Sequence, residues 1–266
     1  SNDGGGTFSG ILQNGAGGAL SLVKAGTGTQ SLTNFSTFTG GTTVNGGTLL
    51  LGAGGGTGTI RGTLTVNTGA TVNYTVANTF GFTAGQSVNV LNINGGTVGG
   101  ADFGQHFWNN FQLNMTGGTL NLGGTLNEFH NPTITINAAP TTAQFLSVTG
   151  LAQMRLRDGT SATINVADGP PAVDFLIAAT VTQNTGTSGI TKTGAGTMTL
   201  SGSGASANTA LGLLQVSGGT LIVNNLANIG SPSSIGAGDD TDDATNAASL
   251  QFNGGTLLYQ GANGVI

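Results

Sequence analysis

The chain has 266 residues, a formal net charge of −5 and no cysteine. The lack of cysteine excludes disulfides, thiolate metal ligands and cysteine nucleophiles. With only 5 Lys and Arg residues in all, the sequence has no basic stripe, which argues against nucleic acid or an anionic membrane surface as a partner. No apolar run approaches the length of a membrane span.

Three residue types dominate the composition, because the chain contains 50 Gly, 42 Thr and 26 Asn. Thr and the β-branched aliphatic residues favour strands, whereas Gly and Asn favour turns with positive φ. Short apolar phrases recur along the chain, which distinguishes it from a disordered glycine-rich segment. The composition therefore predicts many short strands joined by tight turns.

A repeated phrase gives these strands their order. Gly-Gly-Thr tripeptides recur before an apolar residue, among them those that start at Gly46, Gly95, Gly117, Gly123, Gly218 and Gly254. Six of the nine intervals between successive polar turns are 21 to 26 residues long, with the turns placed at Asn14, Asn45, Thr68, Asn94, Thr116, Asn137, Asp158, Asn184, Ser217 and Asn253. This spacing suits one three-sided coil of a parallel β-helix and is too short for a βαβ repeat. We predict a single all-β solenoid over residues 1–266 with roughly ten to twelve coils.

In chain order, the prediction places a first coil near residues 7–22 and distinguishes four segments of the chain. These are a repeat module at 13–52, degenerate coils at 53–182, a second module at 183–224, and an acidic loop with the last coil at 225–266. Leu49, Leu120, Leu221 and Leu257 follow their glycine turns in the same way, so they are expected at equivalent inward positions. Stacked coils are also expected to form Asn and Thr ladders at the turns.

The two modules match each other as blocks. The first contains Lys24-Ala-Gly-Thr-Gly-Thr-Gln-Ser-Leu32, and the second contains Lys192-Thr-Gly-Ala-Gly-Thr-Met-Thr-Leu200, so the only two lysines occupy equivalent places. Each block then reaches a Gly-Gly-Thr-Leu phrase, although the second replaces the preceding Gly-Gly-Thr with Ala210-Leu-Gly.

This module resembles the autotransporter-associated β-strand repeat, also called the passenger-associated transport repeat. The resemblance covers about 80 residues directly, and the Gly-Gly-Thr phrases extend a weaker likeness over most of the rest. It implies a right-handed parallel β-helix in a secreted or surface-exposed bacterial protein, where such repeats form part of a passenger stalk. The expected location is therefore extracellular or on the bacterial cell surface.

An aromatic segment at 101–111 is the first candidate site. Phe107, Trp108 and Phe111 lie there beside Asn and Gln, a combination that can stack on sugars and so offers a surface-glycan site. The favoured interpretation is that the segment is a bulge or strand whose aromatic residues plug one end of the core.

Oxygen-rich and basic residues give the other candidates. Ca²⁺ suits the acidic run of Asp239, Asp240, Asp242 and Asp243, although the spacing is neither that of an EF-hand nor that of an RTX nonapeptide, and a solvated loop is favoured. Arg155 and Arg157 are expected to point outward, exposed, beside Asp158, with anion binding as the minor interpretation. A metal shared between His106 and His130, one coil apart, is a remote alternative.

Three functions remain compatible with the sequence. The favoured one is a non-catalytic stalk or adhesin passenger region of an exported bacterial protein, with no cofactor. The second is an extracellular fibre subunit that stacks end to end, because open coil ends pair with neighbouring repeats or with other copies. The third is a carbohydrate-binding or carbohydrate-cleaving β-helix, for which Glu128 and Asp102, 26 residues apart, offer a carboxylate pair on adjacent coils. A catalytic face assembled from more distant coils stays open at this point.

Overall fold

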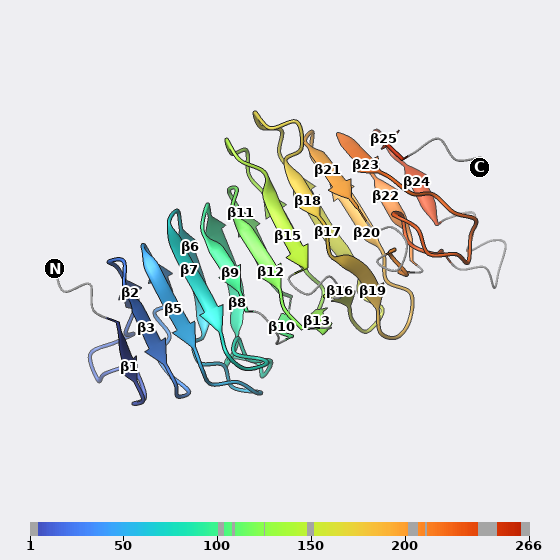
Figure 1. The fold of residues 1–266 in the computed structure, drawn as a ribbon. Coiled ribbons are helices and arrows are strands. Elements are labelled where there is room, and N and C mark those ends of the chain that lie inside the picture. The colour runs from blue at the N-terminus through green and yellow to red at the C-terminus, as the bar shows by residue number, and fades with distance from the viewer. Residues whose placement is uncertain are drawn as a thin grey trace.

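A computed structural model describes residues 5–100, 104–107, 110–124, 126–147, 152–201, 207–210, 212–238 and 249–261. These residues form twenty-five short strands and no helix, and every pairing between named strands is parallel. Figure 1 shows the strands side by side in an elongated stack, with the N-terminus at one end and the C-terminus at the other. The predicted all-β parallel solenoid is confirmed.

Two long sheets run the length of the stack. The first sheet has eleven strands, in the order β1 (Gly6–Phe8), β3 (Thr29–Leu32), β5 (Gly47–Leu51), β7 (Ala70–Tyr74), β9 (Thr97–Gly99), β12 (Thr119–Leu122), β15 (Ala143–Ser147), β18 (Phe175–Ile177), β21 (Thr197–Leu200), β23 (Thr220–Val223) and β25 (Thr256–Tyr259). The second sheet has ten, in the order β2 (Leu22–Lys24), β4 (Thr42–Val44), β6 (Gly62–Asn67), β8 (Val88–Asn94), β11 (Gln112–Met115), β14 (Thr133–Ile136), β17 (Ala162–Val166), β20 (Ile190–Thr193), β22 (Leu214–Val216) and β24 (Leu250–Phe252). Each coil therefore runs from the second sheet, through a tight turn, to the first.

A third sheet closes only the middle of the stack. Its four strands are β10 (His106–Phe107), β13 (Leu126–Phe129), β16 (Gln153–Leu156) and β19 (Thr180–Gln183). The predicted three-stranded coil is thus realised in the central coils. Elsewhere in the described chain the third side consists of loops joined by backbone hydrogen bonds, such as Ser36 N–H to Thr59 O at 3.1 Å.

The predicted turn positions are partly wrong. Seven of the ten, from Asn45 to Asn137 together with Ser217 and Asn253, lie at or beside the turns that lead from the second sheet to the first. Asp158 and Asn184 instead follow third-sheet strands, and Asn14 precedes β2. The error has a physical cause, because Asn and Asp stabilise tight turns at any corner of a coil.

Alternating apolar residues fill the interior. Leu49, Leu120 and Leu221 are fully buried, and Leu257 packs against the same core while partly exposed. All four point inward as predicted, but they do not share one row of the core. Successive strand pairings lead from Leu120 to Val223, two residues beyond Leu221. Leu221 pairs directly with Leu257, in a separate row. The longer turns between β14 and β15 and between β17 and β18 accompany this two-residue shift.

Phenylalanine rings continue the core through the three-sided coils. Phe107 stacks on Phe129 with ring centroids 4.5 Å apart, and Phe145 contacts Phe175 at 4.9 Å. These ring contacts link successive coils within the core.

The second glycine of the Gly-Gly-Thr-Leu phrase has a strict steric role in both modules. Gly47 has φ of 62° and Gly219 has φ of 60°. A Cβ atom on Gly47 would lie 2.5 Å from the carbonyl oxygens of Gly26 and Gly28, and one on Gly219 would lie 2.3 Å from that of Gly196. Glycine is needed here both for the left-handed backbone and for the close approach of the neighbouring coil.

Asparagine ladders form at the turns as expected. Asn67 donates to Asn45 at 2.7 Å, and Asn94 donates to Asn67 at 3.0 Å. A second ladder on the second sheet links Asn114 to Asn92 at 2.9 Å. Each amide satisfies its neighbour one coil away, which ties the coils together with uncharged side chains.

Across the described ranges, no helix is long and apolar enough to cross a membrane.

Candidate functional sites

The third sheet gathers a large share of the ionisable residues of this weakly charged chain. His106, Glu128 and Arg155 align across β10, β13 and β16 on the outward side. The cluster is completed by His130, Arg157 and Asp158, which follow the strands. It therefore contains both histidines, the single glutamate and two of the three arginines in the sequence.

Glu128 is the centre of this ionic cluster. Its side chain is only 6% exposed, because basic groups surround it. His106 Nε2 lies 2.6 Å from one carboxylate oxygen, which Arg157 Nη1 also contacts, and Arg155 Nη1 lies 3.5 Å from the other. A buried carboxylate needs such partners, because burying an unpaired charge is costly.

The second histidine belongs to the same cluster. His130 Nδ1 lies 3.4 Å from Asp158, and the two imidazole rings have centroids 6.3 Å apart. Burial lowers the pKa of His130 to about 4, and Arg157 pushes it in the same direction. Burial also lowers the pKa of His106, against the opposing effect of Glu128. His130 is therefore neutral at physiological pH.

The expectation that the two arginines are exposed is wrong. Their side chains are 26% and 27% exposed for Arg155 and Arg157, respectively. Glu128, one coil earlier in the stack, draws them into ion pairs. Burial opposes the charge of Arg157, but the hydrogen bond and charge of Glu128 outweigh it and raise the pKa of the guanidinium.

The cluster offers little for metal or acid–base chemistry. Within the described parts of the chain, no three His, Cys, Asp or Glu side chains are arranged to hold a metal ion. Glu128 is occupied by ion pairs on both carboxylate oxygens. Its proposed carboxylate partner, Asp102, lies outside the described residues.

Of the three aromatic candidates, two lie among the described residues and one does not. Phe107 is 1% exposed and Phe111 is 0% exposed, so both rings pack in the core and present no face to a sugar. The predicted burial is confirmed, but the rings lie in the middle of the stack and not at one end of the core. Trp108 lies outside the described residues, and so do Asp239, Asp240, Asp242 and Asp243.

The two lysines form a second type of site, which is structural. Lys192 is fully buried, and its ammonium group donates to the carbonyl oxygens of Thr193 at 3.4 Å, Gly194 at 3.2 Å and Gly218 at 2.8 Å. Lys24 repeats this arrangement, with bonds of 2.9 Å to Ala25 and Gly26 and 3.0 Å to Gly46. Each lysine thus links the turn that follows it to the Gly-Gly-Thr turn of the next coil. Burial lowers the pKa of Lys192 to about 8, although Asp174 acts in the opposite direction.

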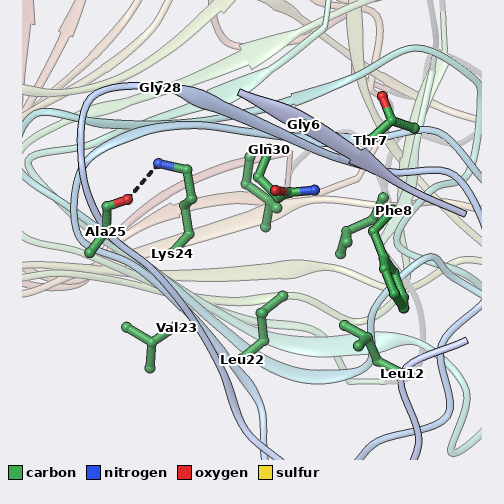
Figure 2. Close-up of a pocket in the computed structure, with 12 residues that line it drawn as sticks. Gly6, Thr7, Phe8, Leu12, Leu22, Val23, Lys24, Ala25, Gly28 and Gln30 are labelled. Atoms are coloured by element: carbon green, nitrogen blue, oxygen red, sulfur yellow. Dashed lines mark hydrogen bonds between the residues drawn. The ribbon is translucent and has the colours of Figure 1, made fainter. Parts of the chain in front are cut away.

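An open cavity marks the N-terminal end of the stack. It has a volume of about 490 Å³ and lies between β1 and β3 on one side and β2 on the other. Figure 2 shows Phe8, Leu12, Leu22, Lys24 and Gln30 around it. Two apolar side chains at this cavity are exposed. Phe8, at the end of the described core, is 38% exposed, and Val23, in the outward row that continues through Thr43, is 61% exposed.

Comparison with known proteins finds a match to each of the two repeat modules. The passenger-associated-transport-repeat profile matches residues 22–51 and 190–223. The first match runs from the start of β2 to the end of β5, and the second runs from the start of β20 to the end of β23. The chain carries two passenger-associated transport repeats. Each repeat is therefore a pair of consecutive coils that includes one lysine bonded to three backbone carbonyl oxygens, which we call a caged lysine.

A curated relative supports the same assignment. The adhesin BmaC autotransporter of Brucella suis biovar 1 (strain 1330) is 39% identical to this chain over 89 residues. The matched region is 34% of this chain and 2% of the relative, so the chain spans a very small part of that protein. No solved structure matches the chain.

Sequence reasoning missed two of these features. The Glu128 cluster draws on residues 22 to 30 positions apart, from His106 to Glu128 and on to Asp158, and only the coil register brings them together. The lysine cage had a visible signal, because the only two lysines occupy matching places before Gly-rich turns. That match indicated duplication without indicating the carbonyl ligands.

Proposed function

We propose that this chain is a non-catalytic, surface-exposed segment of an exported bacterial protein, acting as a rigid solenoid spacer within an adhesin. The observation that carries this proposal is the coincidence of the two matched repeats with complete pairs of coils in one continuous stack. Passenger-associated repeats and an adhesin relative both support an exported setting.

The described ionisable residues favour a structural role over catalysis. The best-placed carboxylate, Glu128, is 6% exposed and bound by His106 and two arginines. A general acid or nucleophile must reach its substrate, and a carboxylate held in this way does not. The ammonium groups of the two lysines likewise donate their hydrogen bonds to backbone carbonyl oxygens.

The test is surface display of the full chain between an export signal and an outer-membrane anchor in a laboratory Gram-negative strain. We expect antibody and protease to reach the chain on intact cells, and displaying cells to adhere to epithelial cells or matrix proteins no more than anchor-only cells do. Adhesion above the anchor-only level would show that the chain itself binds a surface and is more than a spacer. Retention inside the cell, or release of sugar products from a polysaccharide panel, would contradict the proposal.

A further inference from the structure

Every ion pair among the described residues lies in the ionic cluster of the third sheet. Glu128 on β13 joins His106 on β10 to the two arginines at and just beyond β16, so these contacts cross three successive coils. The turns between the long sheets are joined by uncharged side chains instead, as in the ladder from Asn45 to Asn94. A change in protonation therefore acts directly on the joints between coils at the third sheet.

His130 is the member of the cluster that is hardest to charge while it stays in place. It directly follows β13, and its side chain is only 9% exposed. Burial lowers the pKa of His130 from 6.5 to about 4, and the nearby charge of Arg157 acts in the same direction. Asp158, 3.4 Å away, and Glu128 favour a charged ring, whereas a charge on His106 opposes it. Binding a proton therefore favours a form in which the His130 side chain reaches water.

The backbone around His130 can open without unfolding the whole stack. His130 N–H bonds to Phe107 O at 3.0 Å, and Arg157 N–H bonds to Phe129 O at 3.1 Å. These bonds hold the ends of strands only two to four residues long, while the same coils are paired separately in the two long sheets. Phe129 stacks on Phe107 with ring centroids 4.5 Å apart, so lifting the end of β13 uncovers this ring pair.

We propose that the ionic cluster is an acid-sensitive latch, in which protonation of His130 frees the ends of β13 and β16 and opens the third sheet while the long sheets stay paired. Charge gives the direction of this change. With neutral histidines, the cluster balances two arginines against the carboxylates of Glu128 and Asp158. Each histidine that takes up a proton adds a positive charge to this balance. The stack then keeps its length but exposes aromatic core in its middle coils.

The experiment measures amide hydrogen exchange of the full chain at pH 7 and pH 5, with each rate divided by the intrinsic rate at that pH. The amides of Glu128, His130 and Arg157 report on the third sheet. Those of Thr116 and Asn137, bonded to Ile93 O at 2.9 Å and Met115 O at 2.8 Å, report on the turns between the long sheets.

The expected size of the effect follows from His130 alone. A ring that binds its proton with a pKa of about 4 in the closed form and 6.5 in the open form shifts the opening equilibrium about twentyfold between pH 7 and pH 5. We expect the protection of the three third-sheet amides to fall about five- to twentyfold more than that of the two reference amides.

Three variants test the mechanism. His130→Gln cannot take up the proton, so we expect the difference between pH 7 and pH 5 to disappear. Glu128→Gln leaves the two arginines without their shared carboxylate, so we expect at least about fivefold loss of third-sheet protection already at pH 7. Asp168→Asn is the control, because it removes an exposed carboxylate outside the cluster and should change neither result.

Three results would overturn the proposal. The first is equal loss of protection at all five amides, which would mean that the stack unfolds as a whole. The second is no change between pH 7 and pH 5, and the third is an unchanged pH difference in His130→Gln. If Glu128→Gln does not fold, the comparison of His130→Gln with the unsubstituted chain decides alone. The latch does not depend on export or adhesion, so these results leave the proposed function untouched.

Discussion

Replacing Lys192 with methionine tests whether the caged lysines hold successive coils together. Lys192→Met keeps the unbranched stem but removes the ammonium group that bonds to Thr193, Gly194 and Gly218. Hydrogen bonds to charged groups contribute roughly 1.5–3 kcal/mol net, and buried acceptors left without a donor cost about 1–3 kcal/mol each. Removing a buried charge recovers part of this loss. We expect a net destabilisation of about 2–4 kcal/mol.

Lys24→Met is the matched control, because it removes the same bonds at the open end of the stack. Lys24 is half-buried and its carbonyl partners lie near solvent, so water replaces the lost bonds and the cost falls to about 1 kcal/mol or less. Urea unfolding followed by far-UV circular dichroism measures both midpoints. The reasoning fails if Lys192→Met is neutral or stabilising, or if Lys24→Met costs as much.

Three further predictions follow from the packing and the buried histidines. Leu120→Ala and Leu221→Ala should each destabilise the chain by about 2–5 kcal/mol, measured by urea unfolding, because both side chains are fully buried; two unchanged midpoints would contradict the inward register. Gly219→Ala should lower the melting temperature more than Gly69→Ala, since both have positive φ but only Gly219 faces backbone oxygens 2.3 to 2.6 Å from a new Cβ; equal shifts would show that the close approach is unimportant. Because burial lowers the pKa of His130 to about 4 from 6.5, the unfolded chain binds more protons between these values and stability falls as pH falls through this window. The free energy of unfolding should therefore depend less on pH between pH 7 and 4 for His130→Gln than for the unsubstituted chain. An identical slope would show that His130 does not cause the pH dependence.

The fold was predictable because periodic sequence features encode it. The Gly-Gly-Thr-Leu phrases mark turns where Gly47 and Gly219 permit a backbone that other residues resist. Alternating aliphatic residues then assign one face of each strand to the core. These signals are local, so they can be recognised in the sequence without knowing how the coils align.

Register was harder to predict, because it depends on loop lengths that carry no clear pattern. The corners at Asp158 and Asn184 look like the corner at Asn45, yet they follow third-sheet strands. Leu120 and Leu221 lie in rows two residues apart. This shift accompanies the longer turns between β14 and β15 and between β17 and β18. The partners of Glu128 depend on this register, and so the cluster could not be assembled from the sequence.

A distance between the two repeats tests the continuous stack most directly. Thr43 on β4 and Thr193 on β20 belong to one outward ladder, linked through Thr65, Asn92, Asn114, Thr135 and Asn165. The two strands are six positions apart in the second sheet, which at about 4.8 Å per strand places their backbones roughly 29 Å apart. Because the chain has no cysteine, Thr43→Cys and Thr193→Cys introduce the only attachment points for two spin labels. We predict a single narrow distribution near this distance in pulsed electron paramagnetic resonance; a broad distribution, or one centred far beyond it, would mean that the two repeats do not belong to one stack.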